Sequence, residues 1–232
     1  MALNLGALPT AVSHASTLDF SKAVAVTSGQ RIDFTKDNPN VTKVRVELYW
    51  KGDVDGDASV VILDDNDVAL PGVTAAERAQ PTGANGTINT SKTRGMVWYK
   101  NSSVPGITHS GDVTGADEDD TAPEEIIVME LAKLEADAKK ALIVASTYPH
   151  KDDPAQKAVP FGMMRNCKVL VIDDLTNKVL YMYELSEDYD QFTSVELCQF
   201  YLRNGEWRMV NMGTGVGKSA QALADIATKY KL

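Results

Sequence analysis

Two acidic segments carry the side chains of this chain that could do chemistry. The first, GDVDGDAS, spans residues 52–59, and the second, GDVTGADEDDTAPEE, spans residues 111–125. Residues 112–125 contain seven carboxylates and no Lys or Arg, so no cation nearby in the sequence neutralises them. Carboxylates at this density favour a hard divalent ion, because Ca²⁺ takes about six to eight oxygen ligands. The two segments therefore predict one calcium site built from distant loops.

Other kinds of metal site fit less well. The histidines and cysteines lack the paired spacing of a tetrahedral zinc site; they are His14, His109, His150, Cys167 and Cys198. The first acidic segment follows the EF-hand pattern only in part, because Ala58 replaces the turn glycine and Asp64 replaces the bidentate glutamate. A solvated charge run that binds nothing is the alternative for either segment alone. Two such segments favour the calcium site.

No catalytic constellation can be assembled from the motifs. The run 213–219, GTGVGKS, has three residues between its first glycine and GKS, whereas a phosphate-binding loop needs four. We interpret it as a connector between a strand and a helix. No nucleophile-elbow sequence is present, and crowded carboxylates are better explained by a cation than by acid–base catalysis. We expect no enzyme, no catalytic residues and no organic cofactor.

Charge and hydropathy limit the partners. The net charge is −9 and the pI is about 4.8, which argues against nucleic acid because binding phosphates requires a basic face. No apolar stretch approaches the roughly 20 residues of a membrane span, and the first residues lack the pattern of a signal peptide. These features predict a cytoplasmic protein without a membrane span. Cys167 and Cys198 lie in apolar runs typical of strands, so we expect apolar packing rather than a disulfide.

Short strands dominate the expected secondary structure. In residues 43–50, KVRVELYW, the apolar side chains alternate with charged ones, which predicts a half-buried strand. Further strands are expected at 30–34, 59–63, 95–99, 126–131, 141–147, 167–172, 179–185, 195–202 and 207–212. The end of the chain, from Val216 to Tyr230, has helical spacing. This pattern predicts an all-β fold, an antiparallel β-sandwich of two sheets with a C-terminal helix.

Domain organisation follows from composition. Residues 1–23 are rich in Ala, Ser and Thr and predict an N-terminal arm, whereas 24–232 form one domain. Within it, residues 71–94 are rich in Gly, Pro and Thr and predict a long surface insertion.

Several motifs, in order, resemble the TerD-domain family of tellurium-resistance and bacterial stress proteins. They are VTSGQRIDFTKDNPNVTKVRVELYW (26–50), DGDAS (55–59), MVWYKN (96–101), HSGD (109–112), FGMMRN (161–166), YELSEDY (183–189) and NGEW (204–207). The resemblance implies a calcium-binding β-sandwich without an established reaction. It also implies the metal ligands Asp55, Asp57, Asp112, Asp117, Asp119, Asp120 and Glu124. Chemistry alone adds Asp53 and Glu118.

The chain departs from the family pattern in ways that bear on function. Lys51 stands where the family has an aspartate, and the second acidic segment has a different length. We expect a non-enzymatic calcium-binding module, related to stress response or tellurite resistance, that acts as a platform for protein partners or self-assembly. The arm and the insertion favour an alternative role as a structural component of a phage virion or another large assembly.

Overall fold

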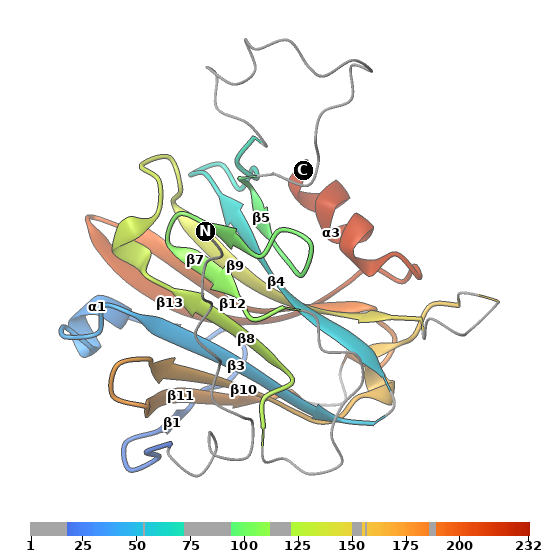
Figure 1. Cartoon of the computed structure of the whole chain (residues 1–232), viewed down its shortest axis with the longest axis horizontal. Coiled ribbons are helices and arrows are strands. Elements are labelled where there is room, and N and C mark those ends of the chain that lie inside the picture. The colour runs from blue at the N-terminus through green and yellow to red at the C-terminus, as the bar shows by residue number, and fades with distance from the viewer. Residues whose placement is uncertain are drawn as a thin grey trace, which may run out of the picture.

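The protein is a sandwich of two β-sheets, described by a computed structural model for residues 18–52, 54–71, 94–111, 122–149, 155, 157–185 and 189–232 (Figure 1). In spatial order, sheet A contains β1 (Val24–Ala25), β11 (Lys178–Glu184), β10 (Arg165–Asp173), β3 (Val44–Lys51), β8 (Glu125–Met129), β7 (Ile107–His109) and β6 (Ser103–Val104). Sheet B contains β2 (Arg31–Ile32), β13 (Glu206–Val216), β12 (Ser194–Arg203), β9 (Lys140–Tyr148), β4 (Asp55–Leu63) and β5 (Met96–Val97).

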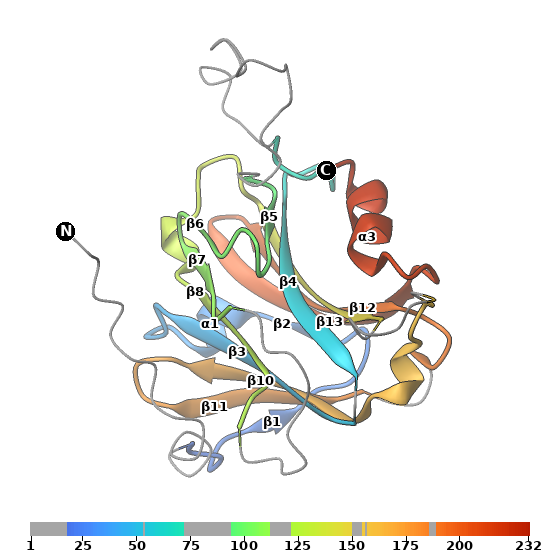
Figure 2. The same ribbon diagram turned by 45° about the vertical axis from the view of Figure 1, so that its right-hand side comes forward.

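The predicted all-β sandwich with a C-terminal helix is confirmed. All pairings between the described strands are antiparallel except that of β1 with β11, which is parallel. Helix α3 (Ala222–Tyr230) lies on the outer face of sheet B, where Ile226 and Tyr230 pack on Val61 and Leu63 of β4 (Figures 1 and 2). None of the described helices is long and apolar enough to cross a membrane.

Strand β3 shows how the alternating sequence builds the core. Val44, Val46, Leu48 and Trp50 face the space between the sheets, as predicted. The other face, expected to be half-exposed, is buried instead: Glu47 is fully buried and accepts hydrogen bonds from Arg45 Nε at 2.7 Å and Tyr49 Oη at 2.6 Å. The outer face of β3 therefore carries a paired charge network rather than a solvated one.

The start of the described chain lies against sheet A. Asp19 bridges to Lys178, and Leu18 and Ala23 pack on an outer cluster that includes Tyr49 and Leu170. Residues 1–17 of the predicted arm and 72–93 of the predicted insertion lie outside the described residues.

Some elements differ from the sequence-based expectations. Phe34, expected to end the strand 30–34, instead begins the single helical turn α1 (Phe34–Asp37), in which the Asp37 amide donates to the Asp33 carbonyl at 2.9 Å. Strands β6 and β7 were not predicted, and the 3₁₀ turns η4 (Leu131–Lys133) and η5 (Phe161–Met163) were likewise missed. The final helix begins at Ala222 rather than Val216, because Val216 still pairs with Ser194 in sheet B.

Consecutive strands β3 and β4 lie in different sheets, and the chain passes from one sheet to the other at one end of the sandwich (Figure 2). Gly52, which directly follows β3, has a φ of +115°, a conformation that favours glycine. Beside the end of β3, the Glu124 amide donates to the Leu48 carbonyl at 2.9 Å. We call this end of the molecule the acidic junction, defined by Asp55, Asp57 and Glu124.

Candidate metal site

Asp55 and Asp57 lie in strand β4 itself and point to the outer face of sheet B. Ala58 and Val60 of the same strand belong to the core between the sheets, whereas Val61 packs beneath α3. Because side chains alternate along a strand, Asp55 and Asp57 share the face of Val61. The carboxylate of Asp57 is thus held beside an ordered sheet rather than in a turn, and the residue is only 8% exposed.

A row of polar residues crosses three strands beside Asp57. Asp57 stands opposite Ser146 of β9, and Ser146 stands opposite Ser194 of β12. The two hydroxyl oxygens lie 2.9 Å apart, and both serines are buried. Buried polar groups in a sheet of this size are stable when they bond to one another, so the row gives Asp57 a fixed, polar surrounding.

The pKa of Tyr148 indicates that this face is negatively charged. It stands opposite Asp55 in the β4–β9 ladder. Burial raises the pKa of the Tyr148 phenol, and the charges of Asp57, Tyr99 and Asp55 raise it further, whereas the Leu223 backbone amide opposes the rise. Leu223 lies in the first turn of α3, so the start of that helix lies beside the Tyr148 hydroxyl. A cation at the acidic junction would meet an already negative surface.

Glu124 directly precedes β8 of sheet A, and the nearby residues His109 and Glu125 connect this sheet to β4 of sheet B. His109 Nδ1 accepts a hydrogen bond from the Gly111 amide at 3.0 Å, so Nε2 carries the proton. Nε2 lies 2.8 Å from the Ala58 carbonyl oxygen of β4 and 3.1 Å from Glu125 Oε2. His109 thus connects both ends of the second acidic segment to the strand that carries Asp57. Sequence reasoning treated His109 as scattered, although the HSGD motif contained it.

The structure places three of the seven predicted ligands. Asp57 and Glu124 are buried, Asp55 is partly buried, and all three lie at the acidic junction. The other four, Asp112, Asp117, Asp119 and Asp120, lie outside the described residues, as do Asp53 and Glu118. Within the described ranges, no group of three or more His, Cys, Asp or Glu side chains is arranged to hold a metal. The available donors are all oxygens, and that chemistry fits a hard cation such as Ca²⁺.

Comparisons with known proteins agree on one family. The TerD-domain profile matches residues 82–230. General stress protein 16U of Bacillus subtilis (strain 168) is 32% identical over 217 residues, covering 90% of this chain and 97% of that protein. Tellurium resistance protein TerD of Serratia marcescens is 24% identical over 220 residues, covering 90% of this chain and 97% of that protein.

A solved structure supports the fold. The crystal structure of a homologue of telluride resistance protein (TerD) from Streptomyces coelicolor A3(2) superimposes with a TM-score of 0.52. It covers 80% of this chain and 96% of that one at 14% sequence identity. At this identity the likeness concerns the arrangement of strands alone.

Proposed function

The chain belongs to the TerD-domain family, and on that premise we propose that it is a non-enzymatic calcium-binding module. The observation that carries the proposal is the position of Asp55, Asp57 and Glu124 at one end of both sheets. Carboxylate oxygens are the ligands that Ca²⁺ prefers, and these three side chains supply them from both sheets.

The carboxylates of the acidic junction and those of residues 112–120 would hold the ion. The flanks of the second segment support this assignment, because they are tied into sheet A: the Ser110 amide donates to the Ile126 carbonyl at 2.9 Å, and the Ile126 amide donates to Ser110 Oγ at 3.1 Å. The two ends of that segment are therefore attached to the neighbouring strands β7 and β8 of sheet A, and Glu124 directly precedes β8. An ion bound there would join sheet A to β4 of sheet B.

The cellular role follows the family. Relatives are named for general stress and for tellurium resistance, and we assign this chain to the same kind of response, acting in the cytoplasm as a rigid platform for protein partners. The assembly alternative depends on residues 1–17 and 72–93, which lie outside the described part of the chain, so it stays a prediction.

Thermal unfolding with and without calcium tests the metal site. An ion that binds only the folded state stabilises it by about 2.7 kcal/mol at a hundredfold excess over Kd. For a domain of this size that corresponds to a rise in Tm of about 5–10 °C, reversed by a chelator.

The matched variants are Asp57→Asn, at the acidic junction, and Asp65→Asn, an exposed position beyond the opposite end of β4. Both remove one negative charge. Asp57→Asn should lose most of the calcium-dependent shift, and Asp65→Asn should keep it. A melting curve of the parent protein that calcium leaves unchanged would refute the calcium site.

A further inference from the structure

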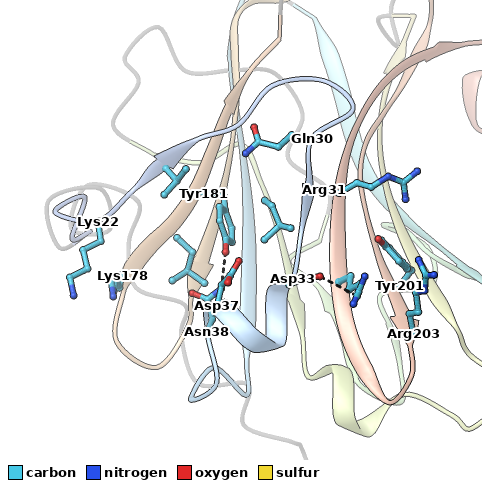
Figure 3. A pocket seen from close by; sticks show the side chains of 14 residues that line it. Lys22, Gln30, Arg31, Asp33, Asp37, Asn38, Lys178, Tyr181, Tyr201 and Arg203 are labelled. Carbon is cyan, nitrogen blue, oxygen red and sulfur yellow. Dashed lines mark hydrogen bonds and ion pairs between the residues drawn. The ribbon is translucent and has the colours of Figure 1, made fainter.

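A groove of about 1050 Å³ opens where the edges of the two sheets separate, at the opposite end of the strands from the acidic junction (Figure 3). One wall comes from β1 and β11 of sheet A, and the other from β2, β12 and β13 of sheet B. Lys178 pairs with Asp173, which stands opposite Val44 at the start of β3, whereas the acidic junction follows the end of that strand. The volume is slightly larger than that of ordinary small-molecule sites, which is roughly 300–1,000 Å³.

Cations line both walls of this groove. Lys22 and Lys178 lie on the sheet A side, and Arg31 and Arg203 lie on the sheet B side (Figure 3). Arg208 of β13 also lies on the sheet B side. The carboxylates among the lining residues are Asp33 and Asp37. Five cations around two carboxylates form a positive site on a protein whose net charge is −9.

Two of these cations act on a carboxylate at the rim: hydrogen bonds from Ser21 lower the pKa of Asp19, and the charges of Lys178 and Lys22 lower it further. Arg208 Nε lies 3.2 Å from Asp33 Oδ1 and is paired. Among the described residues, no carboxylate oxygen lies within 4.0 Å of a charged nitrogen of the other four, Lys22, Lys178, Arg31 and Arg203. Elsewhere, cations such as Lys43 and Lys229 are engaged by carboxylates at 2.8 and 2.5 Å. Unpaired arginines present several donors in a fixed fork suited to phosphate and carboxylate.

The floor of the groove is fixed and polar. Tyr181 is 7% exposed, and its hydroxyl accepts a hydrogen bond from Asn38 Nδ2 at 2.8 Å (Figure 3). Asn38 Nδ2 also donates to the Phe34 carbonyl at 3.1 Å, which holds the residue after α1 in place. The Phe34 ring packs on Tyr181 with centroids 6.2 Å apart. The walls therefore stand on a preformed base, and preformed sites bind with less loss of conformational entropy.

We propose that this groove binds a small multivalent anion, one that carries two or more phosphate or carboxylate groups and bridges the cations of the two sheets. The overall negative charge disfavours a long polyanion, because phosphates beyond the groove would meet the repulsive field of the protein. A compact ligand meets only the local positive potential. This site is separate from the acidic junction and does not depend on calcium.

Isothermal titration calorimetry of the full chain with sodium tripolyphosphate tests the site, in calcium-free buffer because the probe itself binds calcium. The groove variant is Arg31→Gln/Arg203→Gln. The control is Lys100→Gln/Lys133→Gln, two exposed cations outside the groove that give the same change in formal charge. Each lost hydrogen-bonded charge should weaken binding by about tenfold. We expect the groove variant to weaken binding by about a hundredfold, and the control and Asp57→Asn to bind like the parent.

Citrate, titrated in parallel, distinguishes the source of the anionic groups: tighter binding of tripolyphosphate assigns a phosphate ligand, and tighter binding of citrate assigns a carboxylate. Absence of binding to both probes would overturn the proposal. Equal weakening of binding in the groove and control variants would also overturn it, because anion binding would then depend only on the net charge of the protein and not on the groove. Native mass spectrometry tests whether the groove is instead an interface between protein chains. A groove variant that changes the oligomeric state and leaves anion binding intact would show such an interface and would contradict the proposal.

Discussion

Replacing Tyr49 by Phe isolates one hydrogen bond of the buried network on the outer face of β3. The Tyr49 hydroxyl donates to Glu47 Oε2 at 2.6 Å, and Arg45 Nε holds the other carboxylate oxygen. Burial raises the pKa of Tyr49, and the charge of Glu47 raises it further, so the phenol keeps its proton for this bond. Phe preserves the ring that packs on Leu170 and lies under Lys168 Nζ at 4.6 Å. The substitution therefore removes the donor and little else.

The expected loss follows from the charge of the acceptor. A hydrogen bond to a charged group contributes about 1.5–3 kcal/mol, more than one between neutral groups. For a chain of this length, that corresponds to a decrease in Tm of roughly 3–12 °C. Urea titration at neutral pH measures the free energy of unfolding directly, with an m-value unchanged if the substitution acts on the folded state alone.

Tyr201→Phe provides the matched control for Tyr49→Phe. The Tyr201 hydroxyl has no hydrogen-bond partner among the described residues, so its loss should change the free energy of unfolding by no more than about 0.5 kcal/mol. If Tyr49→Phe were as mild as this control, the Glu47 carboxylate would not depend on the phenol, and the account of the buried network would be wrong.

Two further predictions concern buried titratable groups. Burial raises the pKa of Tyr49, Tyr148 and Tyr230 in the folded protein. Above about pH 10 the tyrosines of the unfolded chain therefore lose their protons first, which favours unfolding. The free energy of unfolding should fall as the pH rises from about 10 toward the pKa values of the folded protein, by up to about 1.4 kcal/mol per pH unit for each tyrosine. Urea titrations across the alkaline range check this, and Tyr148→Phe should make the decline shallower; an unchanged slope would contradict it. Cys167 and Cys198 are free and buried, and burial raises the pKa of both thiols to about 12. A thiol reagent at mildly alkaline pH should label neither in the native protein and both in concentrated guanidinium chloride, whereas fast native labelling would show that one of them is accessible.

The sequence was most informative where the relevant residues are contiguous. Alternation in residues 43–50 was enough to place the core face of β3, and Asp55 and Asp57 were recognised because they lie two apart in one extended segment. Strands β6 and β7 have two and three residues, too few for a period to show. The burial of Arg45 could not be predicted from its neighbours, because its partners Asp174 and Asn177 lie about 130 residues further along the chain.

The basic groove could not be found from local patterns. Its cations lie at positions 22, 31, 178, 203 and 208, on strands or turns of both sheets. No window of the sequence is basic, and the overall charge points the other way. Only the pairing of β1 with β11 and of β2 with β13 brings these side chains to one opening.

The crossing of the chain from β3 to β4 also decides how the molecule can be divided. Strand β3 lies between β10 and β8, and β4 lies between β9 and β5. Both precede residue 82, where the match to the family profile starts. A fragment cut at that boundary would lose β1 to β4, including a central strand of each sheet. It would leave new unpaired edges on β11, β10, β8, β13, β9 and β5, and such edges are templates for aggregation. The stretch that the family profile matches and the stretch that folds as a unit are therefore different, and the folded domain includes strands β1 to β4.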